Sequence, residues 1–417
     1  MNSETNHLHL FAGFGVELEY MIVSKNDLRV LPVADKLIYD EVGAYVSDVE
    51  FGNIAWSNEL VQHVVELKTQ GPVASLVGLA DTFQQHIQKI NGMLEKYDAM
   101  LLPTGAHPLM DPHQETVIWQ HEHNAIYEAY NRIFDCRGHG WANLQSTHLN
   151  LPFADDAEFE KLHAAIRMIL PILPALSASS PILDGKLTGF QDTRLEVYRL
   201  NQQKIPSITG HVIPERVFSR KDYEEQILQR SYADVAPHDP DGVLMDEFLN
   251  SRGAIARFGR GTIEIRLLDI QECPAADMAI LQAVVVVLEA LVGGRWGRWR
   301  TLEEQKQFDE KELADIFLQV IRTGQETLLT DIKYLHFFSM DKAEGCSAGE
   351  LWYHLLFDLA DFSEQPEVKH ALDVILTQGN LSRRILKALG ENPTPERIQE
   401  VYRQLAACLQ NGKVFTP

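Results

Sequence analysis

The chain has 417 residues, which is long enough for two or three average domains or one large elaborated one, and its 45% apolar content can supply a sizeable core. Its 37 Lys and Arg residues against 59 Asp and Glu give a formal net charge of −22, which argues against general binding of nucleic acids or anionic membranes. The four cysteines form no CxxC pair and the polar N-terminus shows no signal-peptide pattern. We therefore expect a reduced, cytoplasmic protein without a zinc ribbon or a disulfide framework.

The first informative stretch is residues 13–23, which alternates as a β-strand does. Glu17 and Glu19 fall on one face, and Val16 and Leu18 fall on the other. Two neighbouring carboxylates repel each other unless water, a cation or a basic partner neutralises them. The stretch therefore predicts either a site for magnesium or manganese or the solvated face of an edge strand, which is common in antiparallel sheets.

A second strand is predicted over residues 58–69, after a hairpin formed by residues 26–33 with the first strand. Glu66 shares a face with Gln62 and Val64, whereas Glu59 falls on the opposite face unless a bulge intervenes. Glu66 is therefore the firmer candidate ligand of the two glutamates.

Helical periodicity follows over residues 73–97 and about 114–134, with a short buried strand at 99–103 between them. The second helix contains His121 and His123. Residues two apart do not face each other on a helix, and no HExxH spacing occurs, so no zinc site is expected.

Residues 141–153 again predict a strand, on which His148 and Asn150 project to the same side. A single histidine in a strand is more often structural than functional. A helix over 157–176 follows, with an acidic N-cap at Asp155 or Asp156, and it is kinked or ended by two prolines.

Two further segments are predicted as strands that carry arginines. Over 193–200, Arg194 shares a face with Glu196 and Tyr198. Over 259–270, the apolar alternation leaves Glu264 and Arg266 together on the other face, either as a cross-strand salt bridge or as part of a site.

The apolar run 275–292 contains Asp277, Gln282 and Glu289, so it predicts a buried helix and not a membrane span. Residues 295–300 interleave Arg with Trp, as single-strand nucleic-acid binders do, but a helix-terminal turn is the favoured reading. Beyond Arg300 the pattern predicts helices to the end of the sequence. We expect one domain over 1–300 and a helical region over 301–417 packed on it.

Together the predicted strands indicate an α+β fold: a curved antiparallel sheet whose outer face packs on helices and whose other face forms a pocket. The pocket would collect Glu17, Glu19, Glu66, His148 and Glu264 with the cations Arg194, Arg260 and Arg266. Carboxylates beside arginines suit a polyphosphate held by divalent metal. No GxxxxGK loop or complete dinucleotide fingerprint is present, so metals and side chains would hold the phosphates.

The chain also resembles a known family, the glutamate–cysteine ligases and their carboxylate–amine ligase relatives, which have a glutamine-synthetase-like fold. The resemblance spans about residues 10–290. It rests on residues 15–20 (Gly-Val-Glu-Leu-Glu-Tyr), Glu59 with Glu66, 105–108 (Gly-Ala-His-Pro), 146–150 (Ser-Thr-His-Leu-Asn), 177–181 (Ser-Ala-Ser-Ser-Pro) and 262–266 (Thr-Ile-Glu-Ile-Arg).

The resemblance implies roles for specific residues. It places magnesium on Glu17, Glu19, Glu59, Glu66, His148 and Glu264 and brings Arg194 and Arg266 to substrate or phosphate. Arg260 and Asn150 are expected to contact the cofactor, ATP. Residues 149–151 (Leu-Asn-Leu) resemble the classical bacterial enzymes of glutathione biosynthesis more than relatives with a Gly- and His-rich form of this strand. The last 120 or so residues match no pattern, which leaves the amine acceptor open.

The implied reaction is ATP- and magnesium-dependent amide formation, with manganese as an alternative metal. A carboxylate, in the family the γ-carboxylate of glutamate, becomes an acyl phosphate that an amine such as cysteine attacks. The expected partners are small molecules, with no nucleic acid and no membrane, and a homo-oligomer is compatible with the sequence. Two other functions stay open: a guanidino or carboxylate phosphotransferase on a related fold, and a non-catalytic binding descendant.

Overall fold

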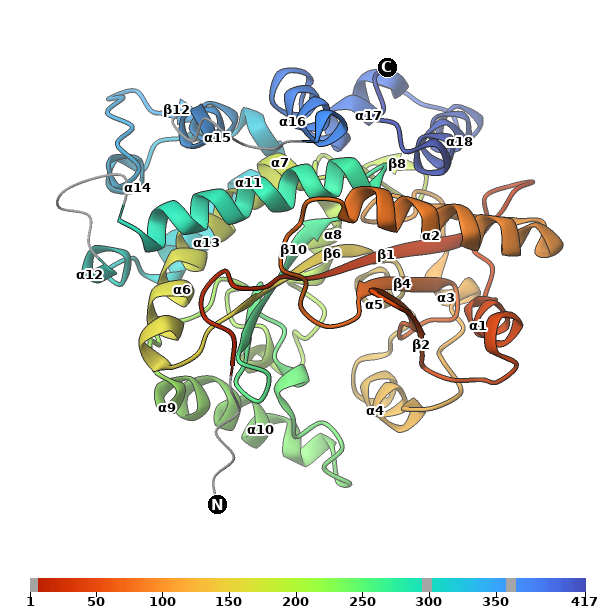
Figure 1. The fold of residues 1–417 in the computed structure, drawn as a ribbon, viewed down its shortest axis with the longest axis horizontal. Helices are drawn as coiled ribbons and strands as arrows, with labels where there is room; N and C mark the ends of the chain where they lie inside the picture. Colours follow the sequence, from red (N-terminus) through yellow and green to blue (C-terminus); the bar gives the residue numbers. More distant parts are fainter. Residues whose placement is uncertain (1–6, 295–301, 358–364) are drawn as a thin grey trace.

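The computed structural model describes residues 7–294, 302–357 and 365–417, and its centre is an eight-stranded antiparallel sheet (Figure 1). Seven strands follow the order β2-β3-β4-β1-β6-β10-β9, and β5 pairs with β1. The strands are β1 Gly15–Ser24, β2 Asp48–Phe51, β3 Ile54–Asn58, β4 Val64–Thr69, β5 Ala99–Leu102, β6 Ser146–Pro152, β9 Ala254–Arg257 and β10 Thr262–Asp269. Every pairing among them is antiparallel, which confirms the predicted fold class.

Long helices cover the outer face of this sheet. α2 (Leu79–Leu94), α6 (Asp156–Ile169) and α11 (Pro274–Val292) pack there, and Figure 1 shows α2 and α11 lying across the strands. The alternation of β1 is as predicted, because Val16, Leu18 and Tyr20 are completely buried on this side. α11 is long and apolar enough to cross a membrane, yet 83% of its most apolar window is buried inside the protein, as expected of a core helix.

The C-terminal part adds an outer layer of helices over α11 (Figure 1). Its elements are α12 Leu302–Gln305, α13 Glu310–Thr323, β11 Leu328–Leu329, α14 Ile332–Phe337, β12 Cys346–Ser347, α15 Ala348–Phe357, α16 Pro366–Gln378, α17 Leu381–Leu389 and α18 Pro395–Asn411. The largest hydrophobic core runs without interruption from the sheet through α11 into α13, α15 and α16. A domain boundary near residue 300 stays a prediction.

Shorter elements lie on the opposite side of the sheet, and those that contain residues 126–130, 140–141 and 194–198 line a cleft. They are α3 Pro112–Glu115, α4 Asn124–Phe134, α5 His139–Ala142, α8 Thr193–Tyr198, α9 Arg220–Tyr223, a π-helical turn Glu224–Leu228 and α10 Gln229–Val235. A small core of their own, which includes Tyr130, Ile133, Ile208 and Leu249, holds α4 and the segment 199–249 together.

One predicted strand is wrong, because residues 193–200 form the helix α8. Asp192 caps this helix by accepting a hydrogen bond from the Leu195 backbone N–H at 2.8 Å, which favours helix over strand. Arg194, Glu196 and Tyr198 therefore do not share a strand face.

Other boundaries also differ from the predictions. The strand expected over 58–69 forms only over Val64–Thr69, because Asn58 is the last residue of β3 and the chain turns after it. The expected hairpin is a single bridge between Val23 and Val30. The helix expected over 73–97 begins at Leu79, and the one expected over 114–134 is two helices separated by an extended segment that bridges Ile118 to Val61. The helix expected over 157–176 is confirmed as α6, which Asp155 caps, followed by helical turns at the two prolines. The Arg–Trp stretch at 295–300 lies outside the described residues.

Candidate active site

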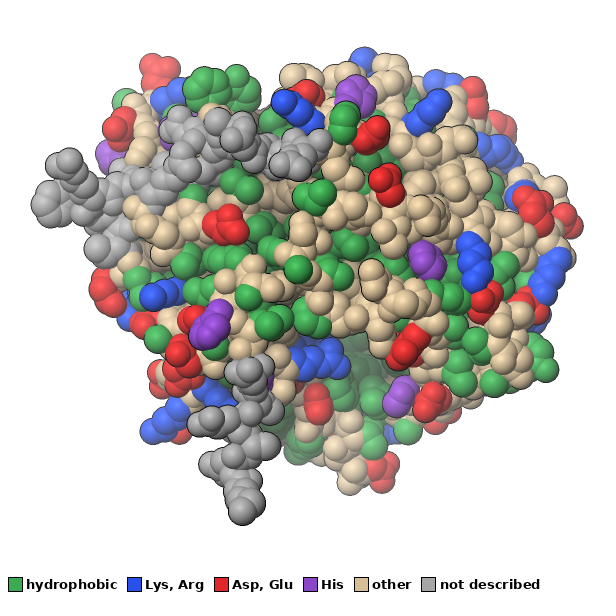
Figure 2. Space-filling view, in the orientation of Figure 1, with side chains coloured by type: hydrophobic (Ala, Val, Ile, Leu, Met, Phe, Trp, Pro, Cys, Tyr) green, Lys and Arg blue, Asp and Glu red, His purple; other side chains and the backbone are tan. Residues whose placement is uncertain are grey.

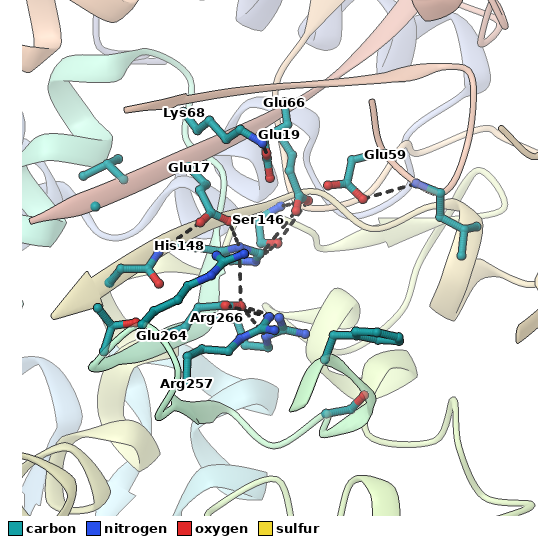
Figure 3. A pocket seen from close by; sticks show the side chains of 18 of the residues that line it. Glu17, Glu19, Glu59, Glu66, Lys68, Ser146, His148, Arg257, Glu264 and Arg266 are labelled. Atoms are coloured by element: carbon teal, nitrogen blue, oxygen red, sulfur yellow. Dashed lines mark hydrogen bonds and ion pairs between the residues drawn. The ribbon is translucent and has the colours of Figure 1, made fainter. Parts of the chain in front are cut away.

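The cleft face of four adjacent strands carries the predicted ligands. In register, Glu19 lies opposite Glu66, and Glu17 lies between Lys68 and His148. Glu264 lies opposite Asn150 on the next strand pair. All of them line one cleft of about 1140 Å³, and Figure 3 shows the side chains converging there. The period-2 alternation of strands is the reason these distant residues meet.

A histidine links the first carboxylate to its neighbours. His148 Nδ1 lies 2.8 Å from Glu17 Oε2, and Asn150 donates a hydrogen bond to Glu17 Oε1 at 3.0 Å. His148 Nε2 lies 2.9 Å from the Ser146 hydroxyl. Burial opposes charge on both groups, but their mutual contact outweighs it, so the pKa of Glu17 is lowered and that of His148 is raised. Without a bound cation this favours an imidazolium–carboxylate pair, and a cation held by His148 would displace the imidazole proton.

Three further carboxylates gather on the other side of His148. Glu19 Oε2 accepts hydrogen bonds from the Ser146 backbone N–H at 2.7 Å and from its hydroxyl at 3.0 Å, and Glu66 accepts one from Ser57 at 2.6 Å. Burial and the charge of Glu17 raise the pKa of Glu66 to about 7. Burial and the charges of Glu19 and Glu66 hold the pKa of Glu59 well above its usual range. These acids crowd one another without a full set of counter-charges.

Two groups of side chains in the described residues have the geometry of cation sites. Glu17, Glu66 and His148 form one, and Glu19, Glu59 and Glu66 form the other, with the candidate ligand atoms of each group within 4.8 Å of one another. Carboxylate oxygens are the ligands that magnesium and manganese prefer, and a divalent cation would relieve the repulsion within each group. The donor set therefore fits two divalent cations that share Glu66. Glu59 joins because the chain turns between β3 and β4, so strand parity no longer applies to it.

Glu264 is engaged differently, by two arginines. Arg257 donates to Glu264 Oε2 at 3.0 Å, and Arg266 donates to Glu264 Oε1 from Nε at 3.0 Å and from Nη2. Burial opposes ionisation of Glu264, but the charges of Arg266 and Arg257 hold its pKa below the usual range. Glu264 belongs to neither cation group, and its predicted metal role stays a prediction. The predicted pairing of Glu264 with Arg266 is present, and it is buried.

Arg194 lines the cleft from α8, and its guanidinium is bound to protein groups. Its Nε donates to Asp269 Oδ1 at 2.5 Å, and its Nη2 donates to the backbone oxygen of Arg266 at 3.2 Å. Ser180 also donates to Asp269. A Cβ on Gly105 would meet the Asp269 carboxylate at 2.3 to 2.5 Å, which explains a glycine in the 105–108 stretch. Arg194 thus supports the strand of Arg266, and its direct contact with substrate stays a prediction.

Arg260 lies in the exposed turn between β9 and β10, at the rim of the cleft. Its assignment to ATP, like that of Asn150, stays a prediction. The structure adds lining residues that were not predicted: Lys68, Ser146, Arg257, Tyr127 and Tyr130. Strand parity could have found the first two, since they lie two residues from Glu66 and His148. The tyrosines come from α4, and no strand pattern points to them.

The chain is similar to several known proteins. Residues 13–404 match the family described as Glutamate-cysteine ligase family 2 (GCS2). An uncharacterized protein of Archaeoglobus fulgidus is 31% identical over 401 residues, which is 96% of this chain and 99% of that protein. A protein of Dechloromonas aromatica named "Putative glutamate--cysteine ligase 2" is 30% identical over 190 residues, which is 43% of this chain and 44% of that protein. A crystal structure of glutamate–cysteine ligase from Francisella tularensis in complex with AMP has the same fold, with a TM-score of 0.61, 13% identity, and coverage of 95% of this chain and 89% of that one.

Proposed function

The chain belongs to glutamate–cysteine ligase family 2, whose members join carboxylates to amines, and we propose that it uses ATP and magnesium to form a γ-glutamyl amide, with glutamate as the carboxylate and an amine such as cysteine as the acceptor. With cysteine the product would be γ-glutamylcysteine, a precursor for glutathione biosynthesis. The observation that carries the proposal is the pair of carboxylate groups that share Glu66 beside the Arg257–Glu264–Arg266 cluster.

The carboxylates alone would repel the triphosphate of ATP. Glu17, Glu19, Glu59, Glu66 and His148 would hold magnesium, which when bound neutralises phosphate charge and withdraws electrons from the transferring phosphoryl group. All of these residues except Glu59 lie on strands of the central sheet, and hydrogen bonds from Ser57 and Ser146 orient Glu66 and Glu19. The positions of the ligands are therefore set before ATP arrives.

Fixed cations complete the site. Arg257 and Arg266 carry two positive charges against the single charge of Glu264, which leaves one in excess. A guanidinium can contact a phosphate or a carboxylate with two parallel hydrogen bonds, so this excess suits the transferring phosphoryl group or the glutamate. Lys68 Nζ, 3.3 Å from Glu66 Oε1, adds a further cation to the same cleft.

The proposed chemistry balances without a covalent bond to the protein. A carboxylate oxygen attacks the γ-phosphorus and the bond to ADP breaks; the amine nitrogen then attacks the acyl carbon, phosphate leaves, and the amine loses a proton. Arginines placed where charge develops stabilise both steps. No cysteine nucleophile is required. Burial raises the pKa of the Cys136 thiol to about 12 and that of Cys273 well above its usual range, which opposes thiolate formation.

The test is the release of ADP from ATP, magnesium and glutamate with a panel of amines, with the amide product identified by mass spectrometry. We expect ADP and amide in equal amounts, and neither without the carboxylate. A phosphorylated product whose formation needs no amine would support a phosphotransferase instead. Nucleotide binding in a calorimeter without turnover of any carboxylate would support a non-catalytic binding protein.

A further inference from the structure

The cleft has a second wall that the proposed chemistry does not use. Six side chains with large apolar surfaces line it, which we call the aromatic wall: Leu60, Ile126, Tyr127, Tyr130, Trp141 and Phe248. Figure 2 shows the surface hollowed below the sheet, with hydrophobic side chains inside the hollow. An apolar wall this close to charged groups is expected where a ligand with both kinds of surface binds.

The aromatic wall is built in advance. Tyr127 and Tyr130 are three residues apart on α4 and so share its cleft face. The Tyr130 ring lies 5.2 Å from that of Trp141 and 6.4 Å from that of Phe248, and Trp141 stacks on Phe134 at 5.5 Å. The small core that includes Tyr130 supports these rings from behind. The rings therefore need little ordering when a ligand arrives.

The wall also touches the reacting centre. The Tyr127 hydroxyl accepts a hydrogen bond from Asn58 at 3.1 Å, and Asn58 directly precedes Glu59. Burial raises the pKa of Tyr127, and the charge of Glu59 raises it further. Tyr130 lines the same cleft as Arg266, whose charge counteracts the rise that burial causes in the pKa of Tyr130. The wall thus borders both the cation groups and Arg266.

The cleft has another end at which the nucleotide can bind without using the aromatic wall. β1 and β10 begin where β4 and β6 end, and there the cleft is lined by Gly13, Gln70, Pro72 and Thr262. In ATP, the ribose and two phosphates separate adenine from the γ-phosphorus. We place the adenine base at that end, with the γ-phosphate toward the cation groups, which leaves the aromatic wall to the second substrate.

On the basis of the proposed function, we infer that the aromatic wall is the acceptor subsite and that it selects a primary amine bearing an aromatic or large apolar group. Cysteine is too small to cover four rings, whereas a phenethyl group can stack on them. Trp141 lines the cleft and stacks on Phe134 behind it, so its indole ring can present an apolar surface to the acceptor.

The experiment compares acceptors at saturating ATP, magnesium and glutamate. Phenethylamine is the large probe, methylamine and cysteine are small probes, and hydroxylamine reports acyl-phosphate formation by giving a hydroxamate. We expect kcat/KM for phenethylamine to exceed that for cysteine and methylamine by at least about tenfold. If hydroxamate forms but kcat/KM for cysteine equals that for phenethylamine, this inference is overturned and the proposed function stays intact. No hydroxamate at all would overturn both.

Variants of the wall sharpen the test. In Trp141→Ala and Phe248→Ala, the ratio of kcat/KM for phenethylamine to that for hydroxylamine should fall at least about fivefold. Tyr130→Phe should keep the ratio, because the ring remains. Tyr353→Ala, which removes a ring that is 58% exposed on α15, is the matched control and should change neither reaction. An unchanged ratio with a raised KM for ATP would assign the wall to adenine and overturn the inference.

Discussion

The two faces of the central sheet differ although the same strands supply both. On β1, Val16 and Leu18 are completely buried under the helices, while Glu17 and Glu19 on the alternate positions lie close to other carboxylates at the cleft face of the sheet. The helix face buries apolar area, which is the main stabilising contribution to folding. The cleft face instead brings like charges together, which costs stability until a cation or ligand arrives.

The comparison shows that residues that stabilise the fold and residues that line the site occupy alternate positions of the same strands. A substitution on the helix face should damage folding, and one at a crowded carboxylate of the cleft face should damage activity while leaving folding intact or improving it. Four substitutions test this separation, from the largest expected effect to the smallest.

Glu66→Gln should cause the largest loss. Glu66 is shared by both cation groups, so the variant weakens both, and we expect kcat to fall at least about a thousandfold, or roughly 4 kcal/mol of transition-state stabilisation. The Tm of the metal-free protein should rise, because a buried charge among carboxylates is removed. Steady-state kinetics and thermal unfolding without metal measure the two effects. Glu128→Gln, on the exposed side of α4, is the control; parental turnover in Glu66→Gln would refute the site.

Leu18→Ala probes the helix face one position away from Glu17. The side chain is completely buried, so truncation should lower the free energy of unfolding by about 3 kcal/mol. The shift of the urea midpoint measures it. Leu328→Ala, at a position 57% exposed, should shift the midpoint very little. If both variants behaved alike, the assignment of this face to the core would be wrong.

His163→Phe tests a titratable group within the helix layer. Burial and the charge of Arg167 lower the pKa of His163 to about 3, and its ring stacks on Phe159 at 5.1 Å. Between pH 6.5 and 3 the unfolded chain binds a proton that the folded chain does not, so His163 makes stability fall as the pH falls. At pH 5 this amounts to about 2 kcal/mol. The variant should therefore lose less stability than the parent between pH 7 and 5 in urea titrations; equal losses would contradict this.

Arg266→Lys should have the smallest effect of the four, at least about tenfold in kcat/KM, or roughly 1.4 kcal/mol. Lysine keeps the charge but cannot make the two-pronged contact with phosphate or carboxylate. Because the pair with Glu264 is buried, some loss of Tm should accompany it, unlike an exposed pair. Arg383→Lys, whose pair with Glu326 is about half exposed, is the matched control for both measurements. A kcat/KM within about twofold of the parent value would instead indicate that Arg266 has only a structural role.

Much of the site could be predicted because strands alternate strictly. Parity alone placed Glu17 with Glu19 and Glu264 with Arg266 on single faces, and both pairs line the cleft. The residues beside helix caps and turns could not be assigned that way. Arg194 lies on a helix that Asp192 caps, and Glu59 lies in a turn where parity does not apply.

By itself, the sequence determined the antiparallel sheet, its apolar outer face and the carboxylates of its inner face, since these follow from local periodicity. Only the tertiary structure decided which carboxylates share a cation group and that α4 brings an aromatic wall to the cleft. The physical reason is that these contacts join elements far apart in the chain. Strand order, register and helix docking set such contacts, and no local pattern encodes them.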